Sequence, residues 1–283
     1  MIPSQVQCWL VDNGYGEIES SHPVGGGCIN NGVQLLTKSG ESFFLKTNNH
    51  APEDMFGREV EGLAILNVTD GPRVPNPYLH ATNFLLMEDL SPSARMPGYW
   101  DDFGRQMAAL HNYTNDEFGF PHDNYIGSTP QLNQWMKDGY LFFTQCRLIF
   151  QAEMAVNRKL LTDQEVKWVE NLAERLKELV PEQPASLIHG DLWGGNAMTD
   201  ENGYPSIIDP AAHYGWAEAD LAMTALFGGF DNRFYDAYNE YRPLPLGWQD
   251  RFDIYNLYHL LNHLNLFGRG YHGQVMRILK RYR

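Results

Sequence analysis

The feature that most constrains the fold is a change in hydrophobic pattern near residue 98. Before it, short apolar runs of strand length predominate, such as residues 33–37 and 42–47, which flank Ser39 and Gly40 as the strands of a hairpin would. After it, apolar residues recur mostly at the spacing of amphipathic helices. The pattern predicts an α+β chain with a small antiparallel sheet first and a larger, mainly helical part second.

One helix is expected among the early strands. Residues 53–68 carry apolar side chains at helical spacing, and this pattern ends before the Asp-Gly-Pro turn at 70–72. Strand candidates at 78–82 and 84–87 follow the turn. The first part of the chain is therefore predicted to be a small lobe made of an antiparallel sheet plus one helix.

Residues 88–97 are predicted to connect two lobes. The segment is polar and contains Pro92 and Pro97, which is typical of a connector. It places a hinge at about 88–97, between an N-terminal lobe at residues 1–90 and a C-terminal lobe at residues 91–283.

The clearest helix of the larger lobe begins at Thr162. Thr162 and Glu165 match a capping box, and the apolar stripe that follows runs on until Pro181. Such a stripe is core packing. Two short apolar strand candidates, residues 186–189 and 206–208, each lead into a loop that carries a carboxylate.

The acidic balance excludes some partners. The chain has 21 Lys and Arg against 35 Asp and Glu, a formal net charge of −14. Such a chain repels phosphate backbones and anionic membranes unless a basic cluster overrides the net charge, and the short basic stretch at residues 277–283 is too small to do so. We expect neither a nucleic-acid nor a membrane partner.

Cysteine usage indicates the compartment. Cys8, Cys28 and Cys146 form no C-x-x-C pair, which favours reduced thiols. The first ten residues lack the charged and then apolar regions of a leader, and no window reaches the roughly 18 uninterrupted apolar residues of a membrane span. We therefore expect a cytoplasmic protein.

The segment from His189 to Asn196 carries the clearest chemical signal. It reads His-Gly-Asp-Leu-Trp-Gly-Gly-Asn, and Asp209 follows at the end of the next apolar strand. Phosphoryl transfer from MgATP uses a carboxylate to accept the proton of the attacking hydroxyl, and amide and carboxylate oxygens to bind Mg²⁺. Asp191 is the candidate base, with Asn196 and Asp209 as candidate metal ligands. Alone, each would more often form an Asx-turn, but the full string between two strands favours chemistry.

The same string resembles the kinase-like phosphotransferases of the aminoglycoside and choline kinase group, which are related to protein kinases. Within this group it is most similar to the fructosamine kinase (ketosamine-3-kinase) family. Segments similar to that family extend over nearly the whole chain: Gly-Gly-Gly-Cys-Ile-Asn (25–30), Phe-Phe-Leu-Lys (43–46), Met-Phe-x-x-Glu-x-x-Gly-Leu (55–63), Leu-Met-Glu-Asp-Leu (86–90), Asp-Asn-Tyr-Ile-Gly (123–127), Ile-Asp-Pro-Ala (208–211) and Asp-Leu-Ala-Met (220–223).

This resemblance implies a two-lobed protein kinase-like fold that uses ATP and Mg²⁺. The implied reaction is phosphorylation of the sugar 3-hydroxyl of ketoamines, either fructosamines or ribulosamines, on free amines or on protein lysines. In that family the phosphorylated adduct decomposes and frees the amine, so the implied role is deglycation by a monomer or weak homodimer. Two alternatives stay open: a kinase of aminoglycosides or other small amino-alcohols, and an ATP-binding pseudokinase.

Further residues fall where the implied nucleotide site requires them. Lys46 ends an apolar strand and Glu59 lies on the following helix, so the two are placed to form the ion pair that holds a lysine against the α- and β-phosphates. Gly25, Gly26 and Gly27 lie between two strands, where glycines let backbone N–H groups approach phosphates. Taken alone, the charges are typical of a surface and the glycines of an ordinary turn.

The connector and the catalytic string supply the last candidates. Glu88 and Leu90 lie in the connector, where kinases bind adenine through main-chain groups. Trp193 lies between the candidate base and two glycines, so it either touches the substrate or only wedges the loop.

Two other features of the sequence each have a structural interpretation as well as a functional one. Cys28 follows the three glycines and is either a small residue that fits a tight loop or a thiol whose oxidation switches off ATP binding. His259 and His263 are four residues apart on a predicted helix, but no glutamate lies between them, so the zinc-protease pattern fails. We expect these histidines to pack or to face solvent.

Overall fold

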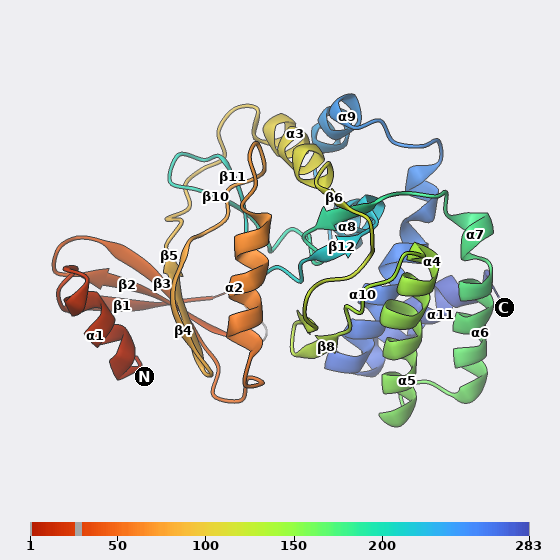
Figure 1. Cartoon of the computed structure of the whole chain (residues 1–283), viewed down its shortest axis with the longest axis horizontal. Helices are drawn as coiled ribbons and strands as arrows, with labels where there is room; N and C mark the ends of the chain where they lie inside the picture. The colour runs from red at the N-terminus through yellow and green to blue at the C-terminus, as the bar shows by residue number, and fades with distance from the viewer. Residues whose placement is uncertain (1, 26–29, 283) are drawn as a thin grey trace.

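The chain folds into a small sheet-containing lobe and a larger helical lobe, shown at the left and right of Figure 1. The structure is a computed structural model that describes residues 2–25 and 30–282. The elements of the first lobe are α1 (Ser4–Asp12), β1 (Ile18–Val24), β2 (Asn31–Thr37), β3 (Ser42–Thr47), α2 (Met55–Leu66), β4 (Pro77–Ala81) and β5 (Phe84–Glu88).

The first lobe is built on a five-stranded antiparallel sheet of order β1-β2-β3-β5-β4. Side chains alternate between the two faces of a strand. On β3, Phe43 and Leu45 are buried in the core under α1, whereas Phe44 and Lys46 point to the opposite face and line a cleft. The alternation of side chains along β3 thus places the Lys46 side chain in this cleft.

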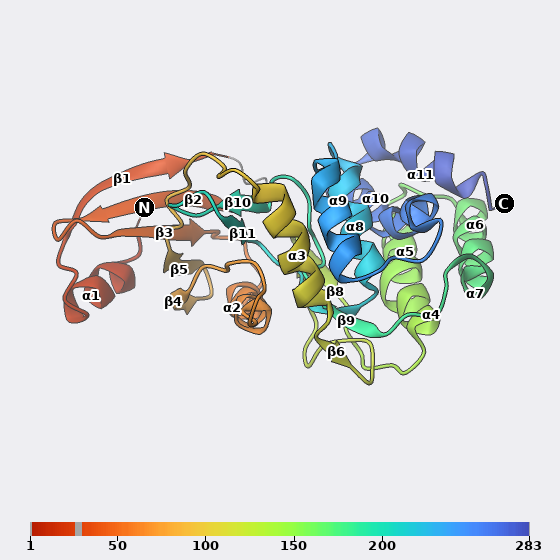
Figure 2. The same cartoon turned by 90° about the horizontal axis from the view of Figure 1, so that it is seen from above.

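The larger lobe contains most of the helices (Figure 2). Its helices and turns are α3 (Tyr99–His111), α4 (Gly139–Phe142), the π-helical η1 (Phe143–Ile149), α5 (Phe150–Asn157), α6 (Asp163–Glu174), α7 (Leu176–Leu179), α8 (Ala217–Leu226), α9 (Asn232–Tyr241), η2 (Trp248–Arg251), α10 (Phe252–Phe267), η3 (Arg269–Tyr271) and α11 (His272–Leu279). Its short strands are β6 (Thr114–Asn115), β7 (Asn124–Ile126), β8 (Thr129–Gln131), β9 (Ala185–Ile188), β10 (Ala197–Thr199), β11 (Pro205–Ile207) and β12 (His213–Gly215).

One hydrophobic core crosses the boundary between the lobes. Leu85 and Met87 of β5 are buried in the same cluster as Phe103 of α3 and Ile207 of β11. Because β11 ends just before Asp209, this shared core fixes the end of that strand relative to the first lobe.

The predicted α+β architecture is confirmed, with differences in detail. The β2–β3 hairpin, α2, β4, β5, β9 and β11 all form where the sequence predicts them. The first lobe also has a second helix, α1, and the single helix expected up to Pro181 is divided at Arg175 into α6 and α7. The capping box of α6 is present as predicted. Among the described helices, none is both long enough and apolar enough to span a bilayer.

Candidate active site

The buried carboxylate of Asp220 fixes the backbone of the loop that follows β9. Asp220 of α8 accepts hydrogen bonds from the backbone N–H groups of His189 at 2.7 Å and Gly190 at 2.8 Å. Gly190 has φ +81°, and a Cβ there would lie 2.2 Å from the Ala211 carbonyl oxygen, so only glycine fits. Burial raises the pKa of Asp220, but the partner His111 and the two backbone donors hold it below the ordinary value.

His189 ties this loop to the end of β11. Burial lowers the pKa of His189, so the ring is neutral and one nitrogen must accept. Its Nε2 lies 2.9 Å from the Ile208 carbonyl, to which only an N–H can bind, and its Nδ1 accepts from the Asp191 N–H at 3.2 Å. The loop that carries Asp191 and the strand end that carries Asp209 are therefore held together by one imidazole.

Asp191 and Asn196 are in direct contact. The Asn196 Nδ2 donates to the Asp191 backbone carbonyl at 2.9 Å and to its Oδ2 at 3.2 Å. Burial of Asp191, followed by the nearby negative charge of Asp209, raises the pKa of the Asp191 carboxyl to about 7. A carboxylate with this pKa is matched to accepting a proton near neutral pH.

Lys46 lies between two carboxylates from different parts of the fold. Its Nζ forms ion pairs with Glu59 of α2 and with Asp209. Burial by itself lowers the pKa of Lys46, but the charges of Asp209 and Glu59 outweigh it and raise the pKa above the ordinary value. Asp209 has φ +56°, a left-handed conformation that is unusual for a residue other than glycine and that accumulates at functional sites.

The donors available for Mg²⁺ are oxygens. Because the Asn196 Nδ2 is committed to Asp191, its Oδ1 is the atom left for a cation, and the Asp209 carboxylate is 40% exposed. No cluster of three His, Cys, Asp or Glu that could hold a metal occurs among residues 2–25 and 30–282. Two protein oxygens fit Mg²⁺, which usually keeps several waters and binds substrate phosphates.

These groups line one cleft of about 890 Å³ between the lobes. Its lining includes Gly25, Lys46, Glu59, Asp191, Trp193, Asn196, Asp209, Phe227 and His263. The Trp193 ring contacts Phe227 at 6.2 Å between ring centroids, and His263 lies 4.8 Å from Phe227. Phe227 was not singled out from the sequence, and His263 of α10 also lines the cleft.

The remaining candidates are not among the residues that line this cleft or are outside the described residues. Gly26, Gly27 and Cys28 are outside the described residues. Leu90, two residues after the end of β5, is buried and does not line the cleft.

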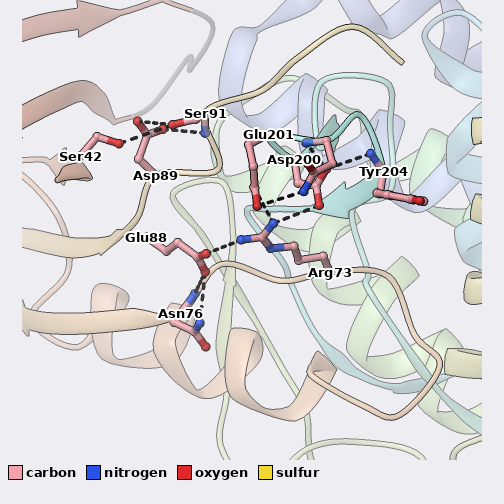
Figure 3. A network of polar contacts seen from close by, with 10 residues as sticks. Ser42, Arg73, Asn76, Glu88, Asp89, Ser91, Asp200, Glu201 and Tyr204 are labelled. Atoms are coloured by element: carbon pink, nitrogen blue, oxygen red, sulfur yellow. Dashed lines mark hydrogen bonds and ion pairs between the residues drawn. The ribbon is translucent and has the colours of Figure 1, made fainter. Parts of the chain in front are cut away.

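Glu88 ends β5 with its side chain in a polar network (Figure 3). Its carboxylate accepts from Arg73 at 2.5 Å and from Asn76. Arg73 also donates to Asp200 at 3.0 Å and to Glu201 at 2.6 Å, in the turn between β10 and β11. Arg73 was not singled out from the sequence, because its carboxylate partners are up to 128 residues away.

Comparison with known proteins agrees with this geometry. A model of the fructosamine kinase family matches residues 2–283. A probable ketoamine kinase of Synechocystis is 40% identical, over 93% of this chain and 90% of its own length. A chloroplastic protein-ribulosamine 3-kinase of Oryza sativa is 37% identical, over 98% and 83%.

Solved structures give the same assignment. A candidate fructosamine-3-kinase from Thermobifida fusca superposes with a TM-score of 0.88 at 31% identity, over 99% of this chain and 98% of its own. An ADP-bound aminoglycoside phosphotransferase shares the fold, with a TM-score of 0.63 at 14% identity, over 99% and 97%. The two-lobed kinase-like fold is thereby confirmed, and the chain belongs to the fructosamine kinase family.

Proposed function

We propose that the chain is an ATP-dependent kinase that phosphorylates the sugar 3-hydroxyl of ketoamines. The observation that carries this proposal is the convergence of Lys46, Glu59, Asp191, Asn196 and Asp209 on one cleft. These are the residue types that phosphoryl transfer from MgATP uses, and they come from both lobes.

Asp191 acts as the base. It accepts the proton of the attacking sugar hydroxyl, and the hydrogen bond from Asn196 holds the carboxylate in place. His189 and Asp220 fix the backbone of residues 189–191 through hydrogen bonds. The Asp191 carboxylate is therefore oriented before the substrate binds.

Lys46 binds the α- and β-phosphates of ATP, and Glu59 holds the lysine side chain in position. Asn196 and Asp209 would hold Mg²⁺, which would neutralise charge on the transferred phosphoryl group. Gly25, together with Gly26 and Gly27, contributes backbone N–H groups to the phosphates. The main chain of Glu88 and Leu90 binds adenine, so residues 1–90 form the nucleotide-binding lobe and 91–283 the lobe that binds the substrate.

The ketoamine substrate is supported by relatives named ketoamine kinases and protein-ribulosamine 3-kinases. The amine is free or belongs to a glycated protein lysine, and its release after phosphorylation gives deglycation. Trp193, beside Asp191 in the cleft, contacts the sugar or the amine. The free thiols of Cys8 and Cys146 agree with a cytoplasmic location.

The test is transfer of phosphate from MgATP to a ribulosamine, a fructosamine and kanamycin in parallel. Turnover of a ketoamine well above kanamycin, lost in the Asp191→Asn variant, supports the proposal. Faster turnover of kanamycin would favour an aminoglycoside kinase, the fold of which this chain shares. ATP binding without turnover of any acceptor would identify a pseudokinase.

A further inference from the structure

The β7–β8 hairpin carries a motif that the proposed chemistry does not use. It contains Asp-Asn-Tyr-Ile-Gly at residues 123–127 and ends at Gln131. Asn124 and Gln131 face each other in the strand register, and only 4% and 1% of their surfaces are exposed. Two primary amides buried as a pair need partners for every polar atom.

A chain of hydrogen bonds fixes the direction of the Asn124 amide. Arg147 is fully buried and can only donate, so the Asn133 Oδ1 must accept from its Nη2 at 2.8 Å. The Asn133 Nδ2 then donates to the Asn124 Oδ1 at 2.9 Å. This leaves the Asn124 Nδ2 to donate to the Ala212 carbonyl, at 2.9 Å.

The Gln131 amide is fixed in the same way. Its Nε2 lies 2.8 Å from the Asn124 Oδ1 and 3.0 Å from the Ala211 carbonyl, and both of these atoms are acceptors. The opposite orientation would bring three acceptors together, so Nε2 must donate to both. The Gln131 Oε1 accepts from the Tyr258 hydroxyl at 2.7 Å.

The two carbonyls that receive these bonds follow directly after the candidate metal ligand. Ala211 and Ala212 lie two and three residues beyond Asp209, which has φ +56°. The Ala211 N–H donates to the His189 carbonyl at 2.9 Å, so the same segment also touches the catalytic loop. Hydrogen bonds on both sides of Asp209 hold its left-handed backbone conformation. The backbone therefore does not have to rearrange when the reaction takes place.

The other face of the hairpin touches the first lobe. Tyr125 lies between two buried hairpin residues and points the opposite way, and its hydroxyl donates to the Asp54 Oδ1 at 2.6 Å. Asp54 directly precedes α2, which carries Glu59. The hairpin therefore contacts both segments that lead to the ion-pair partners of Lys46, the start of α2 and the residues after Asp209.

We propose that Asn124 and Gln131 are positioning residues that hold the Asp209 segment in the conformation that binds Mg²⁺. Asn124 also lines the cleft, and both residues act through the Ala211 and Ala212 carbonyls. The inference rests on the proposed function for the roles of Asp209 and Mg²⁺.

The test compares Asn124→Asp with Thr129→Val. The aspartate keeps the shape of Asn124 but cannot donate to Ala212, and it places a negative charge against a carbonyl. Thr129 is buried in the same hairpin with a hydroxyl that has no partner among the described residues, so Thr129→Val controls for a substitution at this place. Each protein is titrated with Mg²⁺ while binding of a non-hydrolysable ATP analogue is followed by calorimetry, and melting temperatures are recorded.

Asn124→Asp is expected to raise the Mg²⁺ concentration for half-maximal nucleotide binding at least threefold and to lower kcat about tenfold or more, since small misplacements in an active site cost up to about a hundredfold. Thr129→Val should match the wild type in the Mg²⁺ concentration for half-maximal nucleotide binding and in kcat. A variant with a lower melting temperature but an unchanged Mg²⁺ titration would overturn the proposal, because the network would then be structural only.

A second variant, Gln131→Glu, is used if Asn124→Asp does not fold. It keeps the hydrogen bond that Tyr258 donates but loses the one donated to the Ala211 carbonyl. The nucleotide titration needs no acceptor substrate. A wild type that binds MgATP but phosphorylates no ketoamine therefore contradicts the proposed function while the hairpin is still tested. Nucleotide binding that needs no Mg²⁺ in the wild type would overturn the hairpin proposal itself.

Discussion

The Lys46 ammonium forms an ion pair with Asp209 across 163 residues of sequence and joins the sheet of the first lobe to the end of β11. Glu59 binds the same ammonium from α2. Lys46 and Glu59 are almost fully buried, so each charge depends on its partner. Burial raises the pKa of Glu59 above its ordinary value, although the charge of Lys46 opposes this rise.

Replacing Lys46 by methionine is expected to abolish turnover and to destabilise the fold. Removing one partner of a buried ion pair leaves the other charge uncompensated and typically costs about 3 kcal/mol or more. The double variant Lys46→Met/Glu59→Gln should recover most of the stability and none of the activity. Urea unfolding and phosphate transfer measure the two effects, and a double variant no more stable than Lys46→Met would contradict this account.

Asp191→Asn is expected to lower kcat by a factor of about 100 or more, because general-base catalysis contributes about that much. ATP affinity should change little, since the carboxylate acts on the sugar hydroxyl and not on the nucleotide. Steady-state kinetics and calorimetry separate the two quantities. Turnover within a few-fold of the wild type would remove Asp191 from the role of base.

Asp209→Asn should instead change the response to Mg²⁺. An amide binds Mg²⁺ more weakly than a carboxylate, so the half-saturating Mg²⁺ concentration should rise while kcat falls. The variant also loses the charge that pairs with Lys46. A magnesium titration that overlays the wild type would show that the ion is held elsewhere.

The sequence predicted the parts of the site that are local in the chain. Asp191 and Asn196 are five residues apart in one loop, so their spacing alone places them together. The β2–β3 hairpin and α2 follow from periodicity and turn residues, and the family resemblance located Lys46, Glu59 and Asp209.

The rest depends on contacts between distant segments, which no spacing rule reveals. Phe227 enters the cleft because α8 ends beside Trp193, and Arg73 meets its carboxylates only after the lobes pack. The helix α1 was missed because Val6 and Leu10 are its only fully buried residues, too few to give a clear helical period.

Arg73 is expected to stabilise the junction of the lobes. Its backbone pairs with β11 through Pro205 and Ile207, while its side chain bridges Glu88 and Asp200. Hydrogen bonds to charged groups are worth about 1.5–3 kcal/mol, and the 32% exposure of the Arg73 side chain reduces this to about 1 kcal/mol.

Arg73→Met should therefore lower the free energy of unfolding by about 1 kcal/mol. It should also raise the KM for ATP, because Glu88 ends β5 and its main chain is proposed to bind adenine. Arg233→Met is a matched control, since Arg233 pairs with Asp231 on the exposed surface, far in sequence from residues 88–97. Equal effects of the two substitutions would show that the Arg73 network has no special role.

A buried histidine makes the stability of the fold depend on pH. His259 of α10 is buried, and burial, aided by the nearby His263, lowers its pKa to about 3 although Asp220 opposes the shift. In the unfolded chain a histidine has a pKa of about 6.5, so below that pH the unfolded state binds a proton that the folded state excludes. Stability must then fall as the pH falls from about 6.5 towards 3, by up to about 1.4 kcal/mol per pH unit.

His259→Leu removes this titration and is expected to lose less stability than the wild type between pH 7.5 and pH 5.5, by about 1 kcal/mol. His50→Leu is the control, because His50 is exposed and its loss removes an imidazole without opening the core. Urea unfolding at the two pH values gives the difference directly. His111, His189 and His213 are also buried with lowered pKa values, so His259→Leu should reduce the acid sensitivity without abolishing it. If the wild type and His259→Leu lost the same stability on acidification, His259 would have to be protonated in the folded state, and its burial would not control its charge.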